Sequence, residues 1–501
     1  MRPLWIAVVV AATFAAVVRA ESRKPNVLWI VADDHAPYVC GAYGNKIVRT
    51  PNLDHLASEG VRFDRAYCNS PVCTASRQSF LCGRYPRTLG VTLLQTPLPE
   101  GEPTLATRLR AAGYETAGIG KMHFNSNLAH GFDLRIDLPQ HERYLKEHPP
   151  KPLPPDLEVQ PQWRPFRDPA RVWLNSACRP FAARDEDMAG TFLARQAARY
   201  LTERREKPFF LMVSFYEPHS PFRFPLEYRG KYKPVQFAVP KLGPEDDAQI
   251  PAVFRDLTER EKQGILAAYY TSTEFMDKNV GVVLDALKSS GRAADTLVIY
   301  TGDHGYMLGQ HGRFEKHCCY EPAVRAPLLV RWPEHIKTRE NTKTLVEFVD
   351  IAPTVLDVCR VPVPKSMQGK SLAALLRGET KRHRDRIVVE YSENEEAMIR
   401  TERWKFIYST GKRARRDGYA TGRPLPGRTI RLYDEETDPD EMMNLAAKPE
   451  HARRVADFTA QLAEHLKRTA RQPELIPKEG DVHAVLEFCL QPRDVKAPAT
   501  K

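Results

Sequence analysis

Residues 26–34, NVLWIVADD, form a nearly continuous apolar run that ends in two aspartates. A short run rich in β-branched and aromatic residues is typical of a strand buried on both faces, as in a parallel sheet. Three further runs have the same form and also end in polar residues: YETAGIGKMH (114–123), PFFLMVSFYEPH (208–219) and TLVIYTGDHG (296–305). We therefore expect four buried strands of one largely parallel sheet.

Helix patterns separate these strand patterns. In TPNLDHLASEG, Thr50 is placed to cap a helix, Pro51 to occupy its first position and Gly60 to end it, and TLATRLRAAG ends in the same way at Gly113. Alternation of strands and helices predicts an α/β fold with a large, mixed and mostly parallel central sheet flanked by helices.

The pattern changes beyond about residue 380. EEAMIRTERWKFIYST (395–410) indicates antiparallel strands, RLYDEETDPDEMMNLA a strand and turn, and PEHARRVADFTAQLAEHLKRTARQ an amphipathic helix. We expect one large domain over residues 24–380 and a smaller C-terminal α+β domain, with a short antiparallel sheet, over residues 381–501. The proline-rich segment 138–169 is expected to be an irregular excursion from the large domain.

The first twenty residues, MRPLWIAVVVAATFAAVVRA, have the composition of a secretory signal peptide. Their apolar run is shorter than the ~20 residues that a bilayer span needs, which makes an N-terminal membrane anchor the weaker alternative. We therefore expect an exported protein, periplasmic or secreted, with no membrane span once the signal is removed.

Charge and cysteine content fit an exported protein with an anionic partner. Loss of Arg2 and Arg19 with the signal would lower the formal net charge from +11 to +9. The cysteines number nine, and an odd count in an exported protein points to one thiol with a use other than pairing. No zinc-type cysteine spacing is present in the sequence.

Polar residues follow each of the four predicted strands. In an open α/β sheet, ligands bind beyond the carboxyl ends of the strands, so these side chains are expected to share one site. Carboxylates gathered there would repel one another unless a cation held them, and oxygen ligands suit a hard divalent ion such as Ca²⁺ or Mg²⁺; composition alone does not choose among Ca²⁺, Mg²⁺ and Mn²⁺. The residues concerned are Asp33, Asp34, Lys121, His123, His219, Asp303 and His304.

Cys73 lies at the predicted start of another helix, with Arg77 one turn later. The positive helix N-terminus and the guanidinium would lower the pKa of the thiol and attract an oxyanion. A structural or disulfide-bonded cysteine is the alternative interpretation of the same pattern.

The segment Cys73-Thr74-Ala75-Ser76-Arg77 resembles the Cys-x-Pro/Ala-x-Arg signature of the type I sulfatases in the alkaline phosphatase superfamily. Further blocks resemble that family in the family order, among them VADDHAPYVCGAYGN, GYETAGIGKMHF, FYEPHSPF and TGDHGYMLGQHGRFEKH. The resemblance covers most of residues 25–470 and is nearest to the iduronate-sulfatase and choline-sulfatase-like branch.

The resemblance implies an enzyme that hydrolyses sulfate esters. Cys73 would be oxidised to formylglycine by a formylglycine-generating maturation enzyme, and the hydrated aldehyde would be the nucleophile. One Ca²⁺ would be bound by Asp33, Asp34, Asp303 and His304 together with the residue formed from Cys73. Arg77 would steady the formylglycine and His123 would hydrogen-bond it; Lys121 and Lys316 would contact the sulfate, and His219 would stand near the leaving-group oxygen.

Three features depart from the family pattern or stay open. Ala75 replaces the commoner proline, which affects the expected efficiency of Cys73 conversion, and Cys82 replaces a usual threonine. The adjacent pair Cys318 and Cys319 is interpreted as two buried thiols rather than a strained disulfide.

Two rival functions remain open from the sequence. A phosphate or phosphonate ester hydrolase of the same superfamily would use nearly the same groups, and an inactive exported anion-binding protein would never convert Cys73. The expected substrate is a sulfated small molecule or carbohydrate, with no nucleic-acid partner. The basic stretch KRARRDGYATGRPLPGR (412–428) would either reach over the site or form a solvated loop.

Overall fold

The computed structural model describes residues 24–333, 335–336, 339–341 and 344–495. The predicted signal peptide, residues 1–20, lies outside the described residues. None of the helices within the described ranges combines the length and the hydrophobicity that a bilayer crossing requires.

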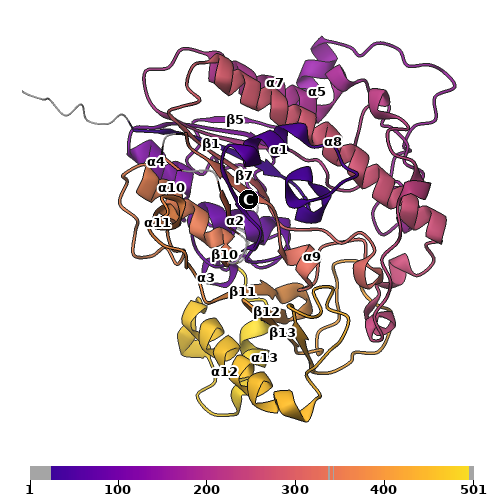
Figure 1. Cartoon of the computed structure of the whole chain (residues 1–501), viewed down its shortest axis with the longest axis vertical. Coiled ribbons are helices and arrows are strands. Elements are labelled where there is room, and N and C mark those ends of the chain that lie inside the picture. The colour runs from indigo at the N-terminus through magenta and orange to yellow at the C-terminus, as the bar shows by residue number, and fades with distance from the viewer. Residues whose placement is uncertain (1–23, 334, 337–338, 342–343, 496–501) are drawn as a thin grey trace, which may run out of the picture.

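An eight-stranded mixed sheet forms the centre of the molecule (Figure 1). The four runs predicted as strands lie parallel at its middle, as β4, β6, β1 and β7. Strand β8 is antiparallel to both β7 and β2, which makes the sheet mixed. In spatial order the strands are β5 (Leu134–Ile136), β4 (Glu115–Gly120), β6 (Phe209–Ser214), β1 (Asn26–Ala32), β7 (Thr296–Gly302), β8 (Leu328–Arg331), β2 (Val61–Phe63) and β9 (Arg339–Asn341).

Helices cover both faces of this sheet, as its two-sided apolar strands require. Alternate residues of β1 enter different apolar cores: Trp29 packs with α2, α4, α10 and α11, and Leu28 packs with α1, α7 and α8. The helices of the large domain are α1 (Pro51–Ser58), α2 (Cys73–Cys82), α3 (Pro86–Leu89), α4 (Leu105–Ala111), α5 (Leu138–Glu147), α6 (Ala170–Trp173), α7 (Ala189–Thr202), α8 (Glu259–Ser289), α9 (Glu321–Val324), α10 (Ile351–Val358) and α11 (Ala373–Leu376).

Two local predictions are wrong. The Thr50 side chain does not cap α1; its hydroxyl donates to Asp54 and accepts the backbone N–H of Gly41 instead. The segment 138–169 is not irregular throughout, because α5 begins at Leu138 with a capping box formed by Asp137 and Gln140. The prolines that follow the helix stop it, and residues 149–169 then run without regular structure.

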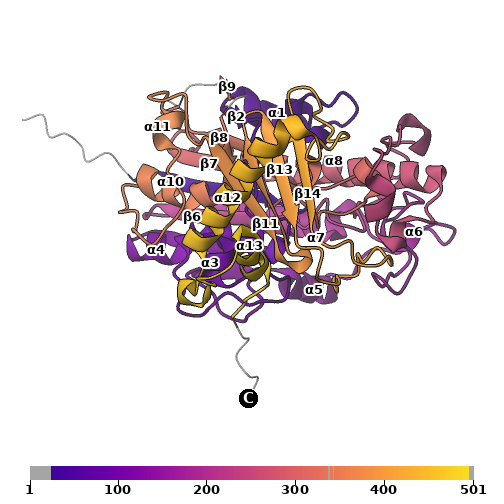
Figure 2. The ribbon, with the colours of Figure 1, turned by 90° about the horizontal axis from the view of Figure 1, so that it is seen from below.

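A separate four-stranded antiparallel sheet forms the C-terminal part, as predicted. Its strands are β11 (Arg386–Tyr391), β12 (Glu396–Thr401), β13 (Trp404–Ser409) and β14 (Thr429–Asp434). Figure 2 shows the amphipathic helix α12 (Ala452–Thr469) lying across this sheet, and α13 (Val482–Leu490) completes the cover. The opposite face, which includes Val389 and Ile407, belongs to the same apolar core as Trp29, so the small sheet packs directly onto the large domain. The remaining short strands, β3 (Ala66–Tyr67) and β10 (Val346–Glu347), pair with each other.

A buried ion pair joins the two parts of the chain. The Arg87 guanidinium at α3 donates from Nε and Nη2 to Oε2 of Glu390 on β11, at 3.0 and 2.7 Å, and the Arg87 backbone N–H donates to Oε1 at 3.1 Å. Both side chains are less than a tenth exposed. A buried charge that loses such a partner is costly, so this contact fixes the small sheet against the large domain.

Replacement of Arg87 by Ala should destabilise the protein strongly, because Glu390 would remain buried without its cation. We expect a loss of about 3–5 kcal/mol of unfolding free energy, seen as a lower urea midpoint. The matched control is Arg199→Ala, which removes an exposed i,i+4 pair with Glu203 and should change stability by less than about 0.5 kcal/mol. Equal effects of the two changes would contradict this account of the junction.

Candidate active site

Four titratable groups, three aspartates and a histidine, meet where β1 and β7 end. Ala32 pairs with Gly302 in the parallel register, so the next residues, Asp33 and Asp303, begin the site side by side. Asp34 and His304 follow them, and all four side chains are fully buried. The Asp34 backbone N–H donates to Oδ1 of Asp303 at 3.0 Å, which ties the two strand ends together.

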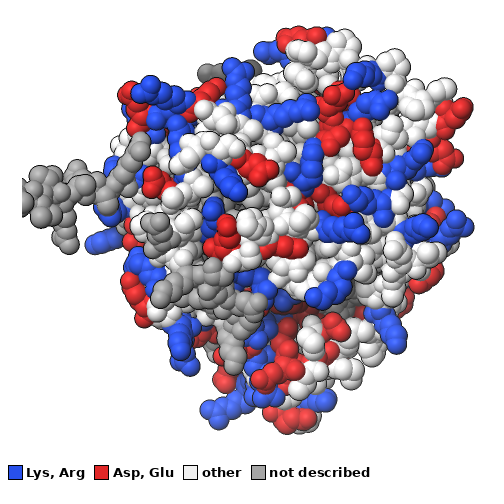
Figure 3. Space-filling model, turned by 45° about the horizontal axis from the view of Figure 1, so that its top comes forward, with Lys and Arg blue, Asp and Glu red and all other residues white. Residues whose placement is uncertain are grey.

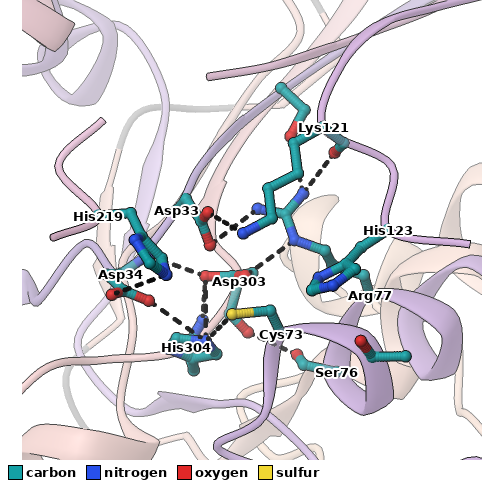
Figure 4. Close-up of polar contacts among 12 residues, drawn as sticks. Asp33, Asp34, Cys73, Ser76, Arg77, Lys121, His123, His219, Asp303 and His304 are labelled. Atoms are coloured by element: carbon teal, nitrogen blue, oxygen red, sulfur yellow. Dashed lines mark hydrogen bonds and ion pairs between the residues drawn. The ribbon is translucent and has the colours of Figure 1, made fainter. Parts of the chain in front are cut away.

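Cys73 is the first residue of α2, as predicted, and its side chain points into this group (Figure 4). Its Sγ lies 3.1 Å from Nε2 of His304. Ser76, one turn later, donates from its hydroxyl to the backbone oxygen of Asp303 at 2.5 Å. The helix start is therefore fixed directly against the end of β7.

The expectation of a lowered Cys73 pKa is wrong. Burial raises the pKa of the thiol above its ordinary value, and the nearby Lys316 and Lys121 charges do not reverse this effect. The side chain is only 2% exposed, so the cost of desolvating a thiolate exceeds the benefit from the two lysine charges. As an unmodified residue, Cys73 is a neutral buried thiol.

Arg77 joins four strand ends, those of β1, β4, β6 and β7, through one fully buried guanidinium. Its Nε donates to Oδ2 of Asp303 at 2.8 Å, and its Nη1 donates to the Lys121 backbone oxygen and to the Ser214 hydroxyl, each at 2.7 Å. Its Nη2 lies 3.3 Å from Oδ1 of Asp33. Arg77 thus places a positive charge directly beside the carboxylates of Asp33 and Asp303.

Two lysines supply further positive charge. Lys121 Nζ contacts Asp33, and Lys316 Nζ donates to both carboxylate oxygens of Asp34, at 2.7 and 2.9 Å. Burial alone would raise the pKa of Asp33, but the Lys121 and Arg77 charges hold it well below the ordinary value. Despite burial, the Lys316 charge likewise holds the pKa of Asp34 below its ordinary value, so Asp33 and Asp34 are ionised, as metal ligands must be. Burial raises the pKa of Asp303 above its ordinary value.

The two predicted histidines lie beside this cluster. Nε2 of His219 is 3.9 Å from Oδ2 of Asp34, and Nδ1 of His219 contacts the Ser220 backbone oxygen at 2.7 Å. Nδ1 of His123 is buried and has no hydrogen-bond partner among the described residues. Burial lowers the pKa of His219 to about 4 and that of His123 to about 2, so both rings are neutral near pH 7.

The donor atoms fit a divalent metal ion. One ligand atom each from Asp33, Cys73, Asp303 and His304 lie within 4.8 Å of one another, and atoms of Asp34, Cys73 and His219 form an overlapping group. Oδ1 of Asp33 is buried and accepts no hydrogen bond, and its ion-pair partner, Nη2 of Arg77, lies 3.3 Å away, so this oxygen has unused capacity for a cation. The predicted residues thus come together as a cluster, rich in carboxylate oxygens, that could hold a metal ion.

A pocket of about 740 Å³ opens onto this cluster. Its inner end is lined by Cys73, Lys121, His123, His219 and Lys316, so the predicted residues share one cavity. Its volume is within the range of about 300–1,000 Å³ typical of small-molecule sites.

One wall of the pocket, residues 92–95, is held by a distant carboxylate. Asp494 accepts the backbone N–H groups of Thr92 and Leu93, each at 2.9 Å from Oδ2, and the hydroxyls of Thr92 and Thr96. Thr92 and Asp494 lie 402 residues apart in the sequence.

Several residues that contact the charged cluster or line the pocket were not predicted from the sequence. Ser214 is the last residue of β6, and its place at a strand end is a signal that could have revealed it. The outer pocket wall comes from the proline-rich segment and from the basic stretch 412–428, which therefore does reach the site. Its members are Phe166, Trp173, Tyr391, Arg416, Asp417, Gly418 and Tyr419.

All nine cysteines lie within the described part of the chain, and none of them forms a disulfide there. Cys318 and Cys319 are two buried thiols, as predicted. The nearby Lys316 side chain is positioned by its ion pair with Asp34.

Comparison with known proteins identifies the family. Residues 25–361 match the family model described as Sulfatase, and residues 309–471 match that described as N-sulphoglucosamine sulphohydrolase, C-terminal. An arylsulfatase of Clostridium perfringens is 29% identical over 464 residues, which cover 86% of this chain and 92% of the relative. An N-acetylglucosamine-6-O-sulfatase of Bacteroides thetaiotaomicron is 27% identical over 516 residues, which cover 90% of this chain and 88% of the relative.

A solved structure of a phosphonate monoester hydrolase of Agrobacterium radiobacter has a similar fold. Its TM-score is 0.75 at 25% identity, and the match covers 91% of this chain and 98% of that chain. The family match over residues 25–361 includes every site residue from Asp33 to Lys316. The chain therefore belongs to the sulfatase family and is a hydrolase of sulfate esters.

Proposed function

We propose that the protein is an exported sulfatase that removes sulfate from a carbohydrate, with formylglycine at position 73 and a bound Ca²⁺. The observation that carries the proposal is the position of Cys73. Its sulfur belongs to both groups of converging metal ligands and also lines the pocket, so one residue is placed to meet the metal and the substrate.

The metal would be held by Asp33, Asp34, Asp303 and His304, and hard carboxylate oxygens favour Ca²⁺ among common ions. When bound, it supplies Lewis-acid stabilisation of negative charge, and the formylglycine supplies a hydrated aldehyde as nucleophile. Conversion of Cys73 requires a maturation enzyme, which we infer as a partner.

The remaining side chains would bind and orient the sulfate ester. Lys121 and Lys316 extend into the inner end of the pocket with charges available to non-bridging sulfate oxygens. His219 lines the same end and lies where it can contact the leaving-group oxygen. Arg77 is fully buried, and its contacts hold the strand ends instead of reaching the pocket.

A carbohydrate substrate is supported by the relative that acts on N-acetylglucosamine 6-sulfate and by the aromatic outer wall of the pocket, because aromatic rings present flat apolar faces to sugar rings. Export is supported by the composition of residues 1–20. On the face seen in Figure 3, Lys and Arg alternate with Asp and Glu, so the net charge does not form a single basic field there.

Phosphate or phosphonate ester hydrolysis is the second candidate, favoured by the structural similarity to the phosphonate monoester hydrolase of Agrobacterium radiobacter. Sulfate and phosphate esters have similar shapes and differ in charge, so the same inner groups would suit either.

The first test compares hydrolysis of 4-nitrophenyl sulfate and 4-nitrophenyl phosphate by protein made together with a formylglycine-generating enzyme. We expect kcat/KM to favour the sulfate by about 100-fold or more, since selectivity is a difference in transition-state binding. A preference for the phosphate would overturn the proposal in favour of the second candidate.

Cys73→Ala should reduce kcat by about a thousandfold or more, because it removes the nucleophile that the proposal requires. Cys178→Ser is the matched control: this cysteine is only partly buried and lies outside the pocket lining, so activity should stay within about twofold. Undiminished turnover by the Cys73 variant would exclude the proposed nucleophile.

Chelation of Ca²⁺ should abolish activity and lower Tm, since the buried carboxylates lose a cation that binds only the folded state. Restoring Ca²⁺ to about 100 times its Kd should return about 2.7 kcal/mol of stability. Differential scanning fluorimetry and activity measured in parallel check both effects. Full activity in metal-free protein would contradict the assigned ligand set.

A further inference from the structure

The outer end of the pocket differs from the inner end in its chemistry. The inner end holds the cluster already described, whereas the outer wall combines the loop 413–419 with residues 165–173. Tyr419 joins the two ends, because its ring lies 4.9 Å from that of His317, next to Lys316. A substrate whose sulfate occupied the inner end would place its next group against this outer wall.

The loop is held rigidly by a buried arginine. The Arg415 guanidinium donates to Asp417 at 2.8 Å, lies 3.7 Å from a Glu315 carboxylate oxygen and packs over the rings of Tyr391 and Tyr419 at 5.4 and 5.7 Å. The Tyr391 hydroxyl also donates to Asp417. Such preorganisation lowers the entropic cost of binding at this wall.

Arg413 and Arg415 in this loop each form an ion pair with a carboxylate, but Arg416 forms none among the described residues. The pocket-lining carboxylates are both occupied: Asp417 by Arg415 and Tyr391, and Glu393 by the Arg413 guanidinium at 3.5 Å. Within the described residues, the exposed Arg416 side chain makes no ion pair or hydrogen bond, although its backbone N–H donates to Glu393. Its guanidinium is therefore a cation at the pocket without a protein counter-charge.

An exposed aromatic ring lies in the same wall. Phe166 is 45% exposed and stands edge-on to Tyr419 at 5.0 Å and beside Trp173 at 5.4 Å. Gly418 permits this approach, because a Cβ there would lie 2.5 Å from the Phe166 ring, and its φ of +87° also favours glycine. The ring is thus supported from behind and open toward the pocket.

We propose that Arg416 and Phe166 form a specificity subsite that binds a sugar carrying a second anionic group besides the sulfate to be cleaved. Phe166 packs on the sugar ring, and Arg416 binds a carboxylate or a second sulfate through charge-assisted hydrogen bonds. A second anionic group would accept charge-assisted hydrogen bonds from Arg416 that a neutral sugar cannot accept, which is why the substrate class is anionic beyond its reacting group. The inference rests on the proposed carbohydrate sulfatase function.

Equilibrium binding tests the subsite without turnover. Isothermal titration calorimetry on full-length, Ca²⁺-loaded Cys73→Ala protein uses two ligand pairs. One pair is N-acetyl-D-glucosamine 6-sulfate and D-glucosamine-2-N,6-O-disulfate, neither of which carries a free ammonium group, and this pair tests a second sulfate. The other is an unsaturated hexuronate 2-sulfate and its methyl ester, which tests a carboxylate. Since binding alone is read, failure to hydrolyse sulfate esters would count against the proposed function and not against the subsite.

We expect the dianionic member of at least one pair to bind about tenfold more tightly than its partner. Arg416→Gln should reduce that ratio to about one, and Arg416→Lys should restore part of it. Phe166→Ala should weaken both members of the pair and leave the ratio unchanged, because stacking does not read the second charge. Arg423→Gln is the matched control from the same stretch: Arg423 pairs with Asp247 outside the pocket lining, and its loss should leave the ratio unchanged.

Equal binding within both pairs, or no measurable binding of any of the four ligands, overturns the inference. A preference that survives Arg416→Gln overturns the role of Arg416.

Discussion

The carboxylates of Asp33, Asp34 and Asp303 lie together with no exposure to solvent, so the fold must supply positive charge around them. The Arg77 guanidinium supplies positive charge by contacting Asp303 and Asp33. Lys121 and Lys316, which line the pocket, supply more by contacting Asp33 and Asp34 respectively. The four neighbouring strands β4, β6, β1 and β7 and the start of α2 are positioned by the contacts of Arg77. The same charges that make burial tolerable also make the inner pocket attractive to an anion.

Most of this arrangement could be predicted because its determinants are local. Apolar runs that end in polar residues identify β1, β4, β6 and β7, and the rule that ligands bind beyond the carboxyl ends of parallel strands brings their polar residues together. The predicted start of α2 at Cys73 is likewise a local property of the chain. Site and sheet are therefore consequences of the same sequence pattern.

Other features depend on distant contacts that no local pattern contains. The thiol of Cys73 was expected to be acidic from its helix position, but burial by surrounding segments decides its pKa. Thr50 was expected to cap α1, but Asp54 and the loop at Gly41 engage its hydroxyl. The outer pocket wall likewise brings together residues near 166 and near 416, which only the three-dimensional packing reveals.

The Asp494 clamp on residues 92–95 has a consequence for biosynthesis. Thr92 leaves the ribosome 402 residues before the carboxylate that fixes its backbone and hydroxyl. At a translation rate of about 5–20 residues per second, that interval is roughly 20–80 s. During this time the central strands can form, but one wall of the pocket lacks its anchor. The charged cluster therefore needs only the chain up to Lys316, whereas the fully shaped cavity also needs the C-terminal Asp494.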